Sequence, residues 1–282
     1  MKTRILASFM ALSAVLWTSC SDEADNLTEN LEIPVADIEI NAQAELLSDQ
    51  IDDIAASVVV DESAAAKSVI SQRVELPACV TITKTANGDK VKKIIDFGNG
   101  CTLANGVAYS GQIIVEYIWN NELRQANIVV GTDNLGVNDL MITGRKEILR
   151  TWPAADQGGY PNSEVQSDLV VAHPSGLNAR VTGTTTREWI AGFGTGNWAD
   201  NVVLIGGNRR VQTYMNDSLL NTYEMEITDN LRREWACRFI VSGTLSLSNS
   251  LFSATLNYGD GNCDNKALLT TSSGRTKEIE LR

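Results

Sequence analysis

Two segments of the chain repeat one order of cysteines, strands and glycines. The first starts at Cys79, continues through two β-rich runs separated by a polar turn, and ends in Asp-Phe-Gly-Asn-Gly-Cys at Cys101. The second starts at Cys237, follows the same order, and ends in Asn-Tyr-Gly-Asp-Gly-Asn-Cys at Cys263. A further hairpin pattern follows each segment. A repeat of this kind predicts two related units within one β architecture.

The first residues of the chain predict export. Lys2 and Arg4 precede an apolar run, Ile5–Leu16, which is too short to span a bilayer and has the length of a signal-peptide core. After Trp17, the small residues Thr18 and Ser19 stand directly before Cys20, in a pattern that resembles the lipobox of bacterial lipoproteins, whose cysteine becomes the acylated first residue. We expect a signal peptide at residues 1–19 and lipidation of Cys20. The alternative is an ordinary secretory signal in which this cysteine is incidental.

Four cysteines beyond Cys20, in an exported chain, predict two disulfides. Three pairings are possible, and we favour Cys79–Cys101 and Cys237–Cys263, each of which closes a loop of just over twenty residues. In the loop-entropy model each bridge stabilises the fold by about 3 kcal/mol. A metal site is the alternative, but the close Cys-x-x-Cys pairs typical of thiolate sites do not occur in the sequence.

A polar tether and one helix are expected between the anchor and the first repeat. Residues 20–38 are acidic and are predicted to form the tether. Residues 39–57 are predicted to be helical, because apolar residues recur at spacings of three and four. This apolar stripe consists of Ala44, Leu47, Ile51 and Ile54, whereas Asp49, Asp52 and Asp53 lie off it. We expect the helix to pack across a sheet or across the end of a barrel.

From Cys79 onward the sequence consists of short β-rich runs separated by turn signals such as Asn87-Gly88 and Ser273-Gly274. No helical period intervenes, so successive strands are expected to pair antiparallel. The predicted fold class is therefore mainly β, an antiparallel meander that forms a barrel or a sandwich, with one short N-terminal helix. It is expected to be a single domain over residues 39–282 that contains both repeats, 79–118 and 237–282.

The glycine motifs of the repeats resemble those of a known family. Asp96–Cys101 is similar to a D-F-G-x-G-C motif, and Tyr258–Asn265 is similar to a Y-G-D-G-x-C-D-N motif. Both motifs occur in a family of Bacteroidetes lipoproteins of uncharacterised function, and the acidic run after Cys20 resembles the signal that places such lipoproteins on the outer face of the outer membrane. The resemblance implies an acyl-anchored outer-membrane protein that faces the cell exterior, with the periplasmic face as the alternative. It brings no catalytic residues.

Composition and spacing argue against several classes of site. The formal net charge of −12 gives no electrostatic footprint for nucleic acid. His173 is the single histidine of the sequence, which excludes sites that need two imidazoles. No pair of carboxylates has a spacing that marks a catalytic dyad. We therefore expect no catalytic residues, no cofactor and no metal.

One segment resembles part of a calcium loop. Asp260, Asn262 and Asp264 alternate like the early oxygen ligands of such a loop. However, the sixth position is Asn265, where glycine is needed, and the twelfth is Thr271, where a bidentate glutamate is needed. The preferred interpretation is that these side chains bond their own backbone in a tight turn.

Three tryptophans are the candidate ligand-binding residues. Trp152 and Trp198 are predicted at strand ends or in loops, and Trp189 shares a strand face with Thr185 and Arg187. Exposed tryptophans in such positions are typical of surfaces that bind sugars or proteins. The alternative is that the three side chains cap the open end of a barrel.

These features favour a lipid-anchored envelope protein that acts as a surface binding module for a glycan or a protein, rather than an enzyme. A structural or accessory subunit of an outer-membrane complex is the first alternative. A glycan hydrolase is the second, and only the expected location supports it.

Overall fold

The structure, a computed structural model, describes residues 35–59, 77–103, 106–154, 158–193, 195 and 197–281, without the side chains of residues 35–37 and 198. The predicted signal peptide, Cys20 and most of the predicted tether lie outside the described residues. The part that is described belongs to one compact unit, Val35–Arg282. Its elements are α1 (Val35–Val58), β1 (Thr81–Asn87), β2 (Lys90–Asp96), β3 (Cys101–Thr102), β4 (Ala108–Asn120), β5 (Gln125–Val137), β6 (Leu140–Thr151), β7 (Asn162–Ala172), β8 (Leu177–Ala191), the 3₁₀ turn η2 (Trp198–Asp200), β9 (Val202–Met215), β10 (Ser218–Glu234), β11 (Ile240–Ser248), β12 (Ser253–Asp260), β13 (Lys266–Thr271) and β14 (Thr276–Glu280).

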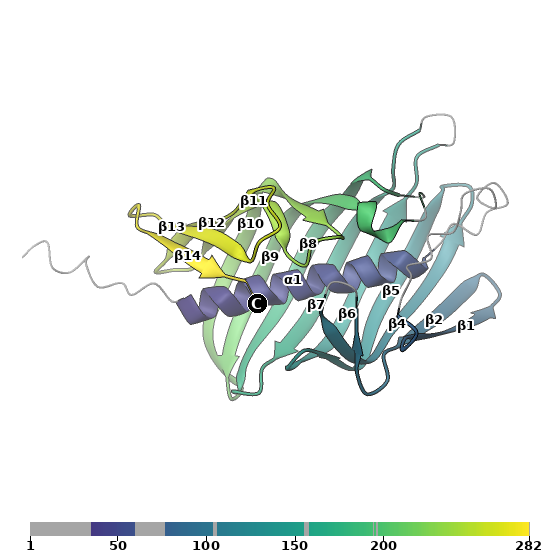
Figure 1. The fold of residues 1–282 in the computed structure, drawn as a ribbon, viewed down its shortest axis with the longest axis horizontal. Coiled ribbons are helices and arrows are strands. Elements are labelled where there is room, and N and C mark those ends of the chain that lie inside the picture. Colours follow the sequence, from purple (N-terminus) through teal and green to yellow (C-terminus); the bar gives the residue numbers. More distant parts are fainter. Residues whose placement is uncertain are drawn as a thin grey trace, which may run out of the picture. The chain divides into compact units, whose positions relative to one another are not determined.

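The strands form one antiparallel sheet, as the sequence predicts. The sheet follows chain order from β1 to β14, except that the short β3 pairs only with β4. Among the described strands β1 and β14 are the two edges, so the sheet is open rather than a closed barrel. α1 lies along its concave side (Figure 1) and contacts strands as distant in the order as β4 and β14. The sheet therefore curves around the helix.

Alternation of side chains gives the central strands a face toward α1 and a convex face toward water, whereas all residues of the edge strand β1 are exposed. In β7 every second residue from Ser163 to Val171 is buried, and the residues between them are exposed or half-buried. The β-rich runs on either side of Gly206 and Gly207 belong to the single strand β9. Two adjacent glycines normally interrupt a strand, but both of these continue the pairing with β8.

The helix differs from its prediction in length and in surroundings. It begins at Val35, four residues before the predicted start and inside the range predicted as tether, and it ends at Val58. Its apolar stripe is buried, as predicted. The three aspartates that lie off this stripe are also buried, at 0–2% exposure, because the sheet supplies partners for them. No helix among the described residues is long and apolar enough to cross a membrane.

Both predicted disulfides, Cys79–Cys101 and Cys237–Cys263, are present. The first fastens the β1–β2 hairpin and the second fastens the β11–β12 hairpin, near opposite ends of the strand order. In each repeat the glycine after the aromatic residue donates its backbone N–H to the side chain two residues earlier, Gly98 to Asp96 and Gly259 to Asn257, both at 2.8 Å. The repeated motif is thus a repeated local structure that positions the cysteine.

Glycines let neighbouring strands approach closely where the sheet bends. Gly183 in β8 has φ +151°, and a Cβ there would lie 2.4 Å from the backbone oxygen of Asn208. Gly207 in β9 has φ +111°, and a Cβ there would lie 2.4 Å from the backbone oxygen of Thr184. Glycine at such positions marks sharp bends in sheets.

The replacement Gly183→Ala is expected to lower the free energy of unfolding by about 2 kcal/mol or more, because the backbone is strained for alanine and the neighbouring strand must move. The matched control is Gly131→Ala in β5, where a Cβ would meet nothing within 4 Å. We expect that change to alter stability by less than about 1 kcal/mol. Urea denaturation of both variants is the measurement, and equal midpoints would contradict this role of Gly183.

Candidate functional site: a buried charge network and a Trp–Arg rim

Four carboxylates of α1 point toward the sheet and are almost completely buried. Glu45, Asp49, Asp52 and Asp53 are each 3% exposed or less. Their spacing of four, three and one places them on neighbouring positions of one helical face. A buried carboxylate is stable only with partners, so the sheet must supply cations.

The cations come from four different strands. Lys146 of β6 donates to Asp52 at 2.6 Å, and Arg209 of β9 donates to Asp49 at 3.0 Å and also contacts Glu45. Arg187 of β8 bonds both Asp49 and Asp53. Arg233 of β10 donates to Asp53 at 3.0 Å. The buried charge network is defined by these eight residues: Glu45, Asp49, Asp52, Asp53, Lys146, Arg187, Arg209 and Arg233.

Burial and ion pairing act in opposite directions on these groups. Burial raises the pKa of Glu45, although the nearby Arg209 opposes this change. Burial also acts to raise the pKa of Asp49, but Arg209, Arg187 and Lys146 outweigh it, and the net result is a lowered pKa. Asp49 therefore contributes stability that is present above its ordinary pKa and is lost as the pH falls through the lowered value.

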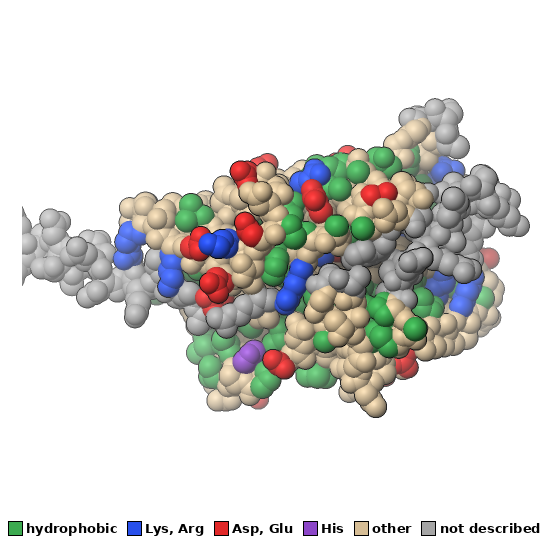
Figure 2. All heavy atoms as spheres, in the orientation of Figure 1, with side chains coloured by type: hydrophobic (Ala, Val, Ile, Leu, Met, Phe, Trp, Pro, Cys, Tyr) green, Lys and Arg blue, Asp and Glu red, His purple; other side chains and the backbone are tan. Residues whose placement is uncertain are grey.

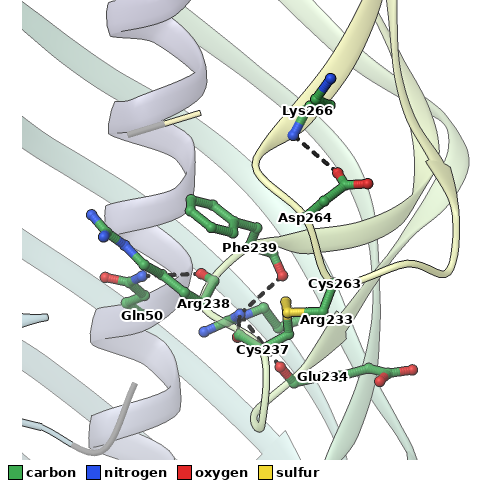
Figure 3. Close-up of a disulfide and its surroundings, with 9 residues drawn as sticks. All are labelled: Gln50, Arg233, Glu234, Cys237, Arg238, Phe239, Cys263, Asp264 and Lys266. Atoms are coloured by element: carbon green, nitrogen blue, oxygen red, sulfur yellow. Dashed lines mark hydrogen bonds between the residues drawn. A yellow bond between two sulfur atoms is a disulfide. The ribbon is translucent and has the colours of Figure 1, made fainter. Parts of the chain in front are cut away.

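The second disulfide loop is tied to the helix through the same network (Figure 3). The Arg233 guanidinium donates to the backbone oxygens of Cys237 and Phe239, and Gln50 of α1 donates to the backbone oxygen of Arg238 at 3.3 Å. At the C-terminal end of α1, Lys93 of β2 donates to the backbone oxygen of Val58. The helix is held at several points along its length.

The structure does not support an exposed aromatic surface at the candidate tryptophans. Trp152 is 6% exposed and Trp189 is 2% exposed, so the expectation that they form an open ligand-binding face is wrong. The reason lies in Arg187, which points inward to the helix carboxylates and shares its strand face with Trp189. The side chain of the third candidate, Trp198, lies outside the described residues.

The tryptophans gather where one set of strand ends meets. β4, β6, β8 and β10 run in the same direction, so their C-terminal ends lie on the same side of the sheet. The Trp119 and Trp152 rings are 4.5 Å apart, and the Trp189 and Trp235 rings are 6.2 Å apart. Arg150 lies over both Trp152 and Trp189 and joins the two pairs. We call these five residues the Trp–Arg rim.

The calcium-like segment makes hydrogen bonds of its own. Asn262 donates to the Asp260 carboxylate at 2.8 Å, and the backbone N–H of Lys266 donates to the Asp264 carboxylate at 3.0 Å (Figure 3). These are the turn bonds that the sequence favours. In the part of the chain that is described, no group of three or more His, Cys, Asp or Glu residues is placed to hold a metal ion.

The convex face carries a shallow hollow of about 620 Å³ across β8, β9, β10 and β11. Its convex-side lining is polar: Thr182, Asn208, Arg210, Glu224, Glu226, Ser246 and Ser248. Arg210 donates to Glu224 at 2.7 Å, so this pair is neutral overall. Figure 2 shows the opposite side of the unit, on which α1 lies in Figure 1, and there acidic and basic side chains are interspersed rather than gathered into one charged field.

Searches against protein-family models, curated proteins and solved structures find no match to this chain. Functional arguments therefore rest on its own geometry.

Sequence reasoning missed the cations of the charge network. The available signal was the alternation of faces along each strand. Each cation lies two positions from an apolar residue and so shares its strand face, as Lys146 does with Ile148 and Arg233 with Leu231. A cation at an inward position on several strands, beside one acidic helix, indicates a buried network.

Lys146→Met is expected to lower the free energy of unfolding by about 3–5 kcal/mol, because it leaves Asp52 buried without its closest cation. The double variant Lys146→Met with Asp52→Leu is expected to regain most of that loss, since no charge is then left unpaired at this position. Chemical denaturation of the single and double variants measures both effects. A double variant that is less stable than the single variant would contradict the pairing.

Proposed function

We propose that this chain is a lipid-anchored protein of the cell envelope whose folded unit binds a glycan on its convex face. The observation that carries the proposal is the polar hollow across β8–β11. The concave side, the other place where a curved sheet can hold a ligand, is filled by α1. A ligand of the folded unit therefore has the convex face or an edge of the sheet to bind.

The chemistry of the hollow suits a ligand rich in hydroxyl groups. Two adjacent rows of side chains cross the strands there, one running Thr182, Arg210, Glu224 and Ser248, the other Asn208, Glu226 and Ser246. Neighbouring strands lie about 4.8 Å apart, so donors and acceptors recur at that interval across each row. Hydroxyl, amide and carboxylate groups exchange hydrogen bonds with sugar hydroxyls.

A protein ligand is the second candidate, and in that case the chain is an accessory subunit. Exposed apolar side chains at the hairpin between β9 and β10 favour a protein ligand. Leu219 and Leu220 are consecutive yet 54% and 48% exposed, and Met215 beside the same turn is 36% exposed. Consecutive exposed leucines on a strand are unusual unless a partner covers them.

The double replacement Asn208→Ala with Glu226→Ala is expected to weaken glycan binding at least tenfold and to leave the fold intact, because both side chains are exposed and in the hollow. Thr143→Ala, an exposed position on the same face of β6 and outside the hollow, is the control. Binding is measured on a panel of soluble glycans by calorimetry. If no glycan binds the wild-type protein while cross-linking on intact cells captures a stoichiometric protein through Leu219 and Leu220, the accessory-subunit reading replaces this one.

Anchoring is tested separately at Cys20. In cells labelled with a radioactive or clickable fatty acid, the wild-type chain is expected to carry the label and to remain with the membrane fraction. Cys20→Ser is expected to lose the label and to enter the soluble fraction, because no acyl chain then holds it. Cys20→Ser protein that still carries the label would contradict lipidation at this residue.

A further inference from the structure

Among the described residues of the folded unit, buried cations outnumber buried carboxylates. Ten charged side chains are buried among the described residues, and six of them are cations while four are carboxylates. Four of the cations belong to the charge network, and a fifth, Lys93, donates to the C-terminal end of α1. The sixth is Arg150 at the Trp–Arg rim, which is 2% exposed.

Arg150 is held by aromatic faces rather than by a carboxylate. Its guanidinium carbon lies 5.0 Å from the centre of the Trp189 ring and 5.7 Å from that of Trp152. Nε donates to the Ser163 hydroxyl at 3.1 Å. No carboxylate lies within ion-pair distance of Arg150 in the described part of the chain, and Nη1 is buried without a hydrogen-bond partner. The Nε1 atom of Trp152 is a second buried donor without a partner.

Two unbonded donors, one of them on a buried cation, are unfavourable in a protein interior unless an acceptor reaches them. Burial and the neighbouring Arg187 together lower the pKa of Arg150 to about 9, so it remains charged at neutral pH. Asp52 acts in the opposite direction on the pKa of Arg150, but the Asp52 carboxylate bonds Lys146. These groups therefore need one negative charge beside them, carried either by an anion with acceptor oxygens or by a halide ion.

We propose that Arg150 and Trp152 form a binding site for one small monovalent anion, a carboxylate group or a halide ion, at the Trp–Arg rim. Arg150 supplies the charge and one N–H, Trp152 supplies the second N–H, and the faces of Trp152 and Trp189 exclude water around the guanidinium. Arg150 is the penultimate residue of β6 and lies where the strands end. The anion therefore arrives from these strand ends and not through α1. The site is separate from the convex hollow and does not depend on the proposed function.

The test measures thermal unfolding of the full chain at nearly constant ionic strength, while small amounts of sodium acetate or sodium bromide are added to a fixed background of sodium sulfate, so that the general stabilising effect of sulfate does not change. The wild-type protein is expected to show a saturable rise in unfolding temperature with at least one of the two anions. Arg150→Met is expected to abolish that rise, whereas Arg180→Met, which removes an exposed arginine paired with Asp168, is expected to keep it. The anion that saturates distinguishes a carboxylate site from a halide site.

A second variant keeps the proposal testable if Arg150→Met does not fold. Trp152→Phe removes the indole N–H and retains most of the ring, and it is expected to raise the half-saturating anion concentration about tenfold. In bromide-soaked crystals of the wild-type chain, an anomalous peak is expected within hydrogen-bonding distance of Arg150. An unfolding temperature of the wild-type protein that saturates with neither anion, or an equal anion response in wild-type and Arg150→Met protein, would overturn the proposal.

Discussion

The contact between the carboxylates of α1 and the inward cations of the sheet is the constraint on which the rest of the structure depends. A helix with four buried acids cannot lie against an apolar sheet, because unpaired buried charge is strongly unfavourable. The strands β6, β8, β9 and β10 must each direct one cation inward, and the sheet must curve so that all four reach one helix. The Trp–Arg rim follows from this geometry, because the tryptophans occupy further inward positions along the strands. The glycines that allow close approach of neighbouring strands follow from it as well.

Such a network specifies an arrangement more than it adds stability. Apolar replacements of buried ion pairs are often as stable as the pairs, whereas loss of one partner is costly. Here the pairs fix both the rotation of α1 and its position along the sheet, because the four carboxylates are bonded by cations from four different strands. The network is also non-local: the Asp53–Arg233 bond joins residues 180 positions apart. Contacts of this separation slow folding, and we expect the two disulfide-bonded hairpins, which are local, to form before the helix is enclosed.

Much of the fold was predictable from the sequence. The antiparallel meander, the two disulfides and the apolar stripe of the helix follow from periodicity, turn residues and cysteine spacing, all of which are local signals. The buried acids were not predicted, because aspartates opposite an apolar stripe normally face water, and their partners lie about 100 or more positions away. For the same reason the burial of Trp189 was not predicted. Sharing a strand face with an arginine indicates an exposed side chain, yet Arg187 points inward. The curvature of the sheet, and with it the choice of an open sheet over a barrel, depends on contacts between distant strands that periodicity does not report.

The two faces of the sheet have different surroundings. The concave face packs against α1, and the convex face carries the exposed side chains that alternate with the buried ones. The most direct test of the central claim is hydrogen–deuterium exchange of the α1 amides compared with those of β8 and β9. If the charge network makes the helix and the sheet one cooperative unit, the amides of α1 from Glu45 to Val58 exchange only through global unfolding, with the same protection as the central strands. If α1 exchanges much faster while β8 and β9 stay protected, the helix detaches on its own and the network is not what holds the structure together.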